Sequence, residues 1–195
     1  MRKFLWGVLI TLLIVFVGGL SVALLGYLPT HANATPPKWE ESLAERALDA
    51  SMEHRAPRVT NPIPATDENL IEGMKIYTMN CAGCHGGLDR KPADFGLSFY
   101  PPAPQLVLNP IDDPDWHVYY AIRTGIRYTG MPAWGKTMNE QDMWKVTAFL
   151  TQIEKLPPAV QEFWKNTTVS SLPSDAEKDS TEKGTDSDRK TQPAK

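Results

Sequence analysis

The chain has 195 residues, with 20 Lys and Arg against 23 Asp and Glu and a formal net charge of -3. This balance excludes a basic field strong enough to gather phosphates, so nucleic acid is not an expected partner. The length accommodates a membrane segment and one small domain. The only two cysteines are separated by two residues, which excludes the disulfide framework of small secreted proteins.

Residues 4–28 contain no charged side chain. A helix of this length, rising about 1.5 Å per residue, exceeds the roughly 30 Å hydrocarbon thickness of a bilayer. Arg2 and Lys3 precede it and should stay in the cytoplasm. We therefore expect a single-pass protein of the bacterial inner (cytoplasmic) membrane, with the rest of the chain on the periplasmic or outer side. A cleaved signal peptide is the alternative, because residues 32–34 read Ala-Asn-Ala, but signal cores span only about 7 to 15 residues.

The composition divides the chain into four segments. Residues 1–34 form the anchor, and 35–65 hold a short helix at 39–55 and a proline-rich linker. Residues 66–165 form the globular domain, and the polar tail at 166–195 should be disordered. We expect the helix to lie near the membrane surface as a spacer, with its apolar face formed by Trp39, Leu43, Ala47 and Leu48.

One motif carries recognisable chemistry, the string Cys81-Ala82-Gly83-Cys84-His85. A Cys-x-x-Cys-His string is an attachment signature of c-type haem. The two thiols add to the two vinyl groups of the porphyrin, and the adjacent histidine is then directed at the iron from the same side. The string therefore predicts one covalently attached haem c.

Two other chemistries use paired cysteines. A structural zinc site needs four ligands, and His31, His54 and His117 lack ligand spacing relative to the string. A thioredoxin-like redox pair needs a β-α-β context, and no strand-like run flanks residues 70–95. Both readings are therefore weaker than haem attachment.

Helical patterns surround the string. Residues 70–77 form a helix that Thr66 or Asp67 can cap, and a second helix spans 139–154 before two prolines. Gly73 and Tyr77 stand eight and four residues before Cys81. The second helix has an apolar face of Met143, Val146, Thr147, Phe149, Leu150 and Ile153.

Over about 100 residues these motifs resemble the small monohaem c-type cytochrome family, with His and Met as iron ligands, in a membrane-anchored bacterial form. The resemblance implies an all-α cytochrome c fold around one haem, preceded by the transmembrane helix. It also implies that Gly73 lets the first helix of the domain approach the last one. Val146 and Phe149 are then expected against Gly73 and Tyr77.

Met131 lies in the loop Tyr128-Thr129-Gly130-Met131-Pro132-Ala133-Trp134, which resembles the axial methionine loop of this family. His85 and Met131 as metal ligands predict a comparatively high reduction potential. The alternative for Met131 is a gap-filling core methionine. That role is expected of Met74, Met79, Met138 and Met143.

His117 is the alternative sixth ligand. It falls in the first turn of a helix that Asp113 can cap and Pro114 can start. Its simpler interpretation is a solvated helical histidine. The neighbouring acidic residues, at 112, 113 and 115, are interpreted as a solvated helix start or as a surface that steers a basic partner.

The resemblance also implies an acceptor for the second ring nitrogen of His85, a proline carbonyl in the segment 100–106. Pro104 is our first choice and Pro102 the second. Residues 88–100 are longer than the usual connection in the family. Haem propionates should be met by Trp134, Tyr100, Arg123 or Arg127, whose alternative roles are core aromatics and solvated arginines.

The sequence shows no arrangement of catalytic side chains, so we expect an electron carrier rather than an enzyme. It would serve a membrane-associated respiratory chain and meet its redox partners through residues 131–134. One alternative is a cytochrome subunit bound permanently to an oxidase or membrane dehydrogenase, with Gly18, Gly19 and Ser21 packing against other membrane helices. Another is a haem sensor or peroxidase-like enzyme in which Met131 leaves the iron.

Overall fold

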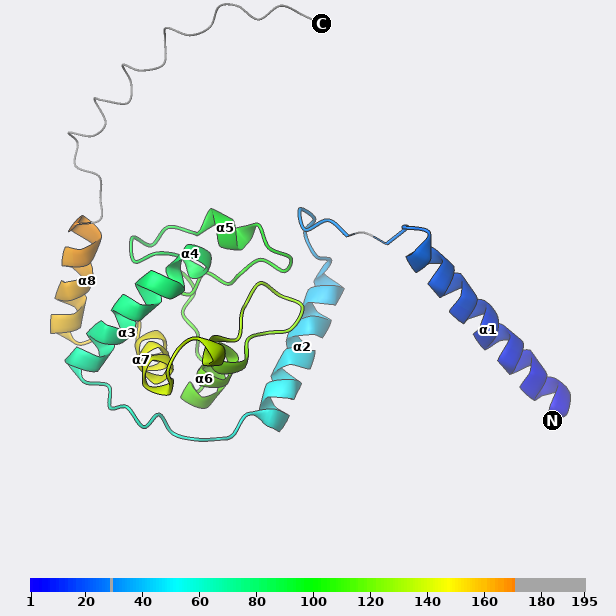
Figure 1. Cartoon of the computed structure of the whole chain (residues 1–195), viewed down its shortest axis with the longest axis horizontal. Helices are drawn as coiled ribbons and strands as arrows, with labels where there is room; N and C mark the ends of the chain where they lie inside the picture. The colour runs from blue at the N-terminus through cyan, green and yellow to red at the C-terminus, as the bar shows by residue number, and fades with distance from the viewer. Residues whose placement is uncertain (29, 171–195) are drawn as a thin grey trace, which may run out of the picture. The chain divides into compact units, whose positions relative to one another are not determined.

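The computed structural model describes residues 1–28 and 30–170, and all regular structure in these ranges is helical. The expected all-α class is therefore confirmed. The predicted disorder of the tail concerns mainly residues 171–195, which lie outside the described residues. Figure 1 shows α1 (Arg2–Leu24), α2 (Lys38–Arg55), α3 (Asp67–Asn80), α4 (Ala82–His85), α5 (Asp94–Leu97), α6 (Asp115–Thr124), the 3-10 helix η1 (Trp134–Lys136), α7 (Glu140–Thr151) and α8 (Pro158–Ser170).

The chain separates into two compact units, Met1–Ala34 and a second unit that begins at Thr35. The first unit consists of α1, whose 23 residues rise about 35 Å at 1.5 Å each. No residue of α1 is buried within the structure. Its length and apolar composition suffice to cross a membrane, although a signal sequence would pass the same test.

The second unit is organised around the contact between α3 and α7. The Thr66 side chain caps α3 by accepting from the Asn69 amide at 3.3 Å. A Cβ atom on Gly73 would overlap the Lys145 carbonyl oxygen and would lie 3.1 Å from the Phe149 Cβ. The rings of Tyr77 and Phe149 pack at 5.6 Å between centroids. The expected contact of Phe149 with Gly73 and Tyr77 is thus present, whereas the nearest backbone neighbour of Gly73 is Lys145 rather than Val146.

The apolar core lies between α3, α6, α7 and α8. Met74 and Met143 are buried in it, as expected for gap-filling methionines, and Met138 packs against it. Met79 is different, because its side chain is 75% exposed. The core members from the four helices are Leu70, Met74, Tyr77, Val118, Tyr119, Ile122, Met143, Trp144, Val146, Ala148, Phe149, Leu150, Val160 and Trp164.

Helix α2 is part of the domain and not a spacer. It contacts α6, and it buries Met52 and the following Ala56. The Tyr100 hydroxyl donates to the Glu40 carboxylate at 2.8 Å, so a loop of the domain is fastened to the first turn of α2. The predicted apolar face is only partly correct, because Trp39 and Leu43 are 69% and 62% exposed and Ala47 is exposed, whereas Leu48 is half-buried. The packed side of α2 is formed by Glu40, Leu48 and Met52, which lie four or eight residues apart and therefore share one face of the helix.

Helix α8 was not anticipated. The prolines after α7 were expected to end the last helix, but Pro158 also starts a new one, since its ring is compatible with a first helical turn. Val160 and Trp164 are buried, and the Trp164 indole donates to the Leu88 carbonyl at 2.7 Å. The helix runs to Ser170, so the domain extends beyond the boundary expected at residue 165.

Candidate haem site

The Cys-x-x-Cys-His string forms one helical turn directly after α3. Cys81 caps α3 by donating its amide to the Tyr77 carbonyl at 2.8 Å, and α4 continues from Ala82 to His85. The His85 amide donates to the Cys81 carbonyl at 2.9 Å. Residues three and four apart share one side of a helical turn, so this local structure brings Cys81, Cys84 and His85 to the same side.

His85 is oriented by the proline loop. Its Nδ1 lies 2.8 Å from the Pro104 carbonyl oxygen, the pairing that the sequence favoured over Pro102. A carbonyl can only accept, so Nδ1 donates in this contact and Nε2 is the ring nitrogen left to bind a metal. His85 is half-buried, and no hydrogen bond to its Nε2 is found within residues 1–28 and 30–170. With the Pro104 carbonyl fixing the plane of the ring, His85 has the arrangement that metal-binding histidines commonly show.

Tyr77 fastens the attachment turn to α3. Its hydroxyl donates between two carbonyl oxygens, those of Gly86 at 2.8 Å and His85 at 3.0 Å. Tyr77 is completely buried, and this burial raises the pKa of its hydroxyl above the ordinary value. The neutral phenol is thus retained as a hydrogen-bond donor. Gly86 follows with φ +90, a left-handed conformation in which glycine is favoured and which ends the turn.

Gln105 holds the other side of the turn and was not identified from the sequence. It is buried, and its amide nitrogen donates to the carbonyls of Cys84 at 3.1 Å and Ala103 at 2.9 Å. Its side-chain oxygen accepts from the Ala93 amide at 2.7 Å. Helix α5 also closes on this turn, because a Cβ on Gly96 would overlap the Cys84 carbonyl oxygen. The long 88–105 segment therefore serves to wrap the attachment turn.

Replacing Gln105 with Leu should destabilise the domain by about 3 kcal/mol. The substitution leaves partly buried backbone groups at Cys84, Ala93 and Ala103 without their partner, and each such loss costs on the order of 1 kcal/mol. The free energy of unfolding would be measured by denaturant titration. The matched control is Gln141→Leu on the exposed face of α7, expected to change stability by less than about 0.5 kcal/mol. Equal effects of the two substitutions would contradict the bracing role of Gln105.

The methionine loop is closed by its own hydrogen bonds. The Ile126 amide donates to the Met131 carbonyl at 3.2 Å, and the Met131 amide donates to the Thr129 hydroxyl oxygen at 3.1 Å. Gly125 adopts φ +67, where a Cβ would lie 2.7 Å from the Ala133 amide nitrogen. The Met131 side chain is half-buried and packs against the core cluster, as do Cys81 and Trp134. One apolar cluster is therefore in contact with both halves of the candidate site.

His117 is not the solvated histidine expected. It is 7% exposed, and its Nδ1 lies 3.1 Å from the Asp113 carboxylate. Its Nε2 is enclosed by protein and has no hydrogen-bond partner among the described residues. Asp113 does not cap α6, because the helix begins at Asp115 with Pro114 before it and Asp113 faces His117 instead. Neither ring nitrogen of His117 is thus open to a group outside the protein.

The four residues considered for propionate contacts lie in different surroundings. The Tyr100 hydroxyl is engaged by Glu40. Trp134 begins η1 and packs against the core. Arg123 and Arg127 are exposed, and the Arg127 guanidinium lies 5.0 Å from the centre of the Tyr128 ring. Their roles toward propionates stay predictions.

The donor set fits haem better than zinc or dithiol chemistry. The described residues contain no group of three or more His, Cys, Asp and Glu side chains that could hold a metal ion. Cys81 and Cys84 are both free thiols. Burial, with a smaller contribution from Cys84, raises the pKa of Cys81 to about 12, whereas reactive redox cysteines need a lowered pKa. The absence of strands from the described ranges likewise gives no β-α-β context.

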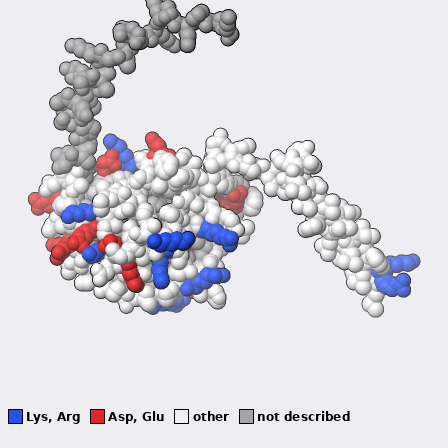
Figure 2. Space-filling view, in the orientation of Figure 1, with Lys and Arg blue, Asp and Glu red and all other residues white. Residues whose placement is uncertain are grey.

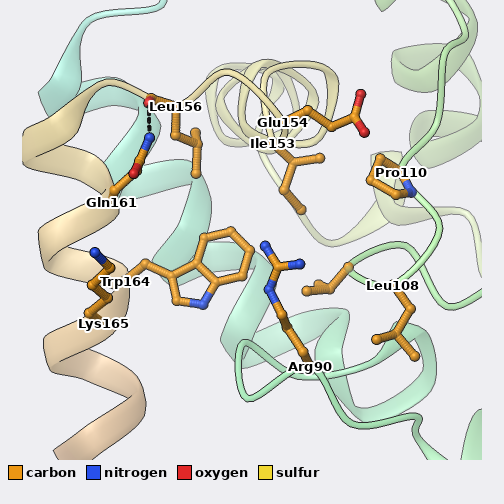
Figure 3. Close-up of a pocket in the computed structure, with 10 residues that line it drawn as sticks. Arg90, Leu108, Pro110, Ile153, Glu154, Leu156, Gln161, Trp164 and Lys165 are labelled. Atoms are coloured by element: carbon orange, nitrogen blue, oxygen red, sulfur yellow. Dashed lines mark hydrogen bonds between the residues drawn. The ribbon is translucent and has the colours of Figure 1, made fainter.

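A separate cavity of about 510 Å³ opens between α8 and the loops around Arg90 and Leu108 (Figure 3). Arg90 lies over the Trp164 ring, 5.4 Å from its centre. The residues that line the cavity include neither the attachment turn nor Met131. It is therefore distinct from the candidate haem site.

Comparison with known families agrees with this geometry. Residues 68–150 match the family model described as cytochrome c oxidase, cbb3-type, subunit III. This segment is a c-type cytochrome domain. The cytochrome domain contains the attachment turn, the methionine loop and most of α7, so the expected cytochrome c fold is confirmed. Helix α2 and helix α8 lie outside the matched range. No curated protein matches the chain significantly.

Proposed function

We propose that the cytochrome domain is a one-electron carrier with a single haem c, attached to Cys81 and Cys84 and ligated by His85 and Met131. When bound, the haem supplies an iron that alternates between the ferric and ferrous states. The observation that carries the proposal is the contact between His85 Nδ1 and the Pro104 carbonyl beside the two free thiols. This contact leaves Nε2 as the imidazole nitrogen that can bind iron, on the histidine that directly follows Cys84.

The protein's own contribution is to hold, shield and tune this group. Tyr77 and Gln105 fix the backbone of the attachment turn from two sides. The closed loop from Gly125 to Ala133 limits the freedom of Met131, so the thioether would be held in place. A thioether ligand favours the ferrous state relative to a second imidazole, and this suits the oxidising half of a respiratory chain.

The sixth ligand is tested by Met131→Ala. We expect the methionine-to-iron charge-transfer band of the oxidised protein to disappear and the reduction potential to fall, because the soft ligand is lost. His117→Ala is the control and should leave the band intact, since its Nε2 is enclosed and its Nδ1 faces Asp113. A band that persists in Met131→Ala and vanishes in His117→Ala would assign the ligand to His117 instead.

We further propose that α1 anchors the chain in the bacterial inner membrane with the cytochrome domain on the periplasmic side. The apolar length of α1 and the preceding Arg2 and Lys3 support this orientation. Protease added to intact spheroplasts should degrade the domain, and a high-salt wash should not release the protein from membranes. Protection from protease until the cells are lysed would reverse the orientation.

A second candidate is a subunit held permanently in an oxidase, which the description of the matched family favours. A Cβ added to Gly18 or Gly19 would meet no atom within 4 Å outside the backbone of α1 among the described residues, so this face of α1 leaves room for another helix. Co-purification with a multi-subunit complex after mild detergent extraction would support this candidate. Recovery of the cytochrome alone would support the free carrier.

A further inference from the structure

We propose that the outward face of α2 lies on the surface of the lipid bilayer and holds the cytochrome domain against it. The outward face is the exposed stripe of Trp39, Leu43, Ala47 and Ala50. The inference rests on the proposed function, because it needs α1 to anchor the chain in a membrane. In Figure 2 the visible surface of α1 has charged side chains only at its N-terminal end, which is compatible with that anchor.

Helix geometry separates the outward face from the packed side of α2. At 3.6 residues per turn, the four members of the outward face fall within about 80° of the helix circumference. Leu48 and Met52, which pack toward the domain, lie on the opposite side. All four members are exposed, with Trp39 at 69% and Leu43 at 62%. Packing within the described part of the domain therefore leaves an apolar face of α2 exposed.

The residue types on and beside this face suit the boundary between lipid and water. Tryptophan combines an apolar ring with an N–H donor and is enriched at membrane interfaces. Leu43 adds apolar area one turn further on. Arg46 borders the stripe, and its long stem allows the guanidinium to reach lipid phosphates. The carboxylates of Glu41 and Glu45 lie on other sides of the helix, so the stripe itself carries no acidic side chain.

The short connection to the anchor makes the bilayer the favoured occupant of this face. The uncharged stretch of the anchor ends at Leu28, and α2 begins at Lys38. The nine residues 29–37 reach at most about 30 Å when fully extended. An apolar face of this size binds membranes weakly without a second attachment. The anchor supplies that attachment, because tethering raises the effective concentration of the face at the bilayer.

Helix α2 is joined firmly enough to the domain to transmit the contact. The Tyr100 hydroxyl donates to the Glu40 carboxylate at 2.8 Å, and Met52 and Ala56 are buried. Helix α2 also contacts α6, whose C-terminal end leads into the methionine loop. A bilayer contact through α2 therefore sets the height and tilt of the candidate haem site above the membrane.

Photocrosslinking in membranes identifies what covers the outward face. The photoreactive residue p-benzoylphenylalanine replaces Leu43 in one full-length variant and Glu41 in a matched control. Both positions are exposed on α2, but they lie on opposite sides of the helix. Membranes of the producing cells are irradiated, and adducts are identified by mass spectrometry and gel electrophoresis. A lipid adds its own mass to the labelled peptide, whereas a crosslinked protein gives a larger band.

We expect at least about tenfold more lipid adduct at position 43 than at position 41. A helix lying flat in the interface places its two sides about 10 Å apart in depth, so only one side reaches the acyl chains. If the Leu43 variant does not accumulate, Ala47 and Glu45 provide a second pair with the same opposition. Lipid adducts should then predominate at position 47.

Three results would overturn the proposal. Equal lipid adducts at positions 43 and 41, in a protein that stays in salt-washed membranes, would refute the docking of α2 and leave the anchor intact. Protein adducts at position 43 in place of lipid would show that a partner subunit covers the face. Recovery of the protein outside the membrane fraction would refute the anchor, and the docking with it. Haem staining of the same samples tests the proposed cofactor separately.

Discussion

The double variant Cys81→Ser, Cys84→Ser is expected to lose all haem staining on denaturing electrophoresis. Thioether bonds are covalent and survive denaturation, whereas the proposed coordination of the iron by His85 and Met131 would not. Each single variant keeps one thiol and should retain a weaker stained band. The total loss is the largest effect we expect from any change in the chain.

The matched control is Ser98→Ala, an exposed position in the same wrapping segment, which should stain like the unmodified protein. Total protein on the same gel must be compared, so that loss of stain is separated from loss of the chain. A double serine variant with an undiminished stained band would show that haem is not attached at these thiols. An unmodified protein without stain would refute the proposed cofactor itself.

Gly73→Val is expected to destabilise the domain by more than about 3 kcal/mol. A Cβ at this position would overlap the Lys145 carbonyl oxygen, which belongs to the backbone of α7 and cannot turn aside as a side chain can. The two helices must then separate, and the contact between Tyr77 and Phe149 is weakened. Because Tyr77 also fastens the attachment turn, haem incorporation should fall as well.

Met79→Val is the control, since it places the same side chain on an exposed position of the same helix. Denaturant unfolding and haem content would be measured for both variants. Gly73→Ala, which adds the Cβ alone, provides a milder test where Gly73→Val does not accumulate. Gly73→Ala as stable as Met79→Val would contradict the close approach of α3 and α7.

The features predicted from sequence are those that depend on short spacing. The attachment string, the Gly73 and Tyr77 register and the apolar face of α7 each lie within one helix or one turn. Their relative positions follow from helix geometry, with no knowledge of the tertiary structure. The Pro104 contact with His85 came from the family resemblance, because residues so far apart in sequence have no local signature.

The features that sequence analysis missed depend on which of two possible faces is covered. In α2 the apolar Trp39 and Leu43 are exposed, whereas the packed side holds the charged Glu40 together with Leu48 and Met52. Glu40 is accommodated because Tyr100 donates to it, and this pairing joins segments distant in sequence. Gln105 was missed for a related reason, since a buried amide is recognisable only from the backbone groups that surround it.

The wrapping segment has a consequence for the order of events during maturation. Gly96, Gln105 and Leu106 all meet the backbone of Cys84 or His85, so the segment from 88 to 106 cannot close without enclosing the turn. A reagent or enzyme that joins haem to these thiols needs both thiols accessible. We therefore expect the proposed haem attachment to precede closure of this segment. Once closed, the segment would hold the attachment turn in place after the haem is joined to it.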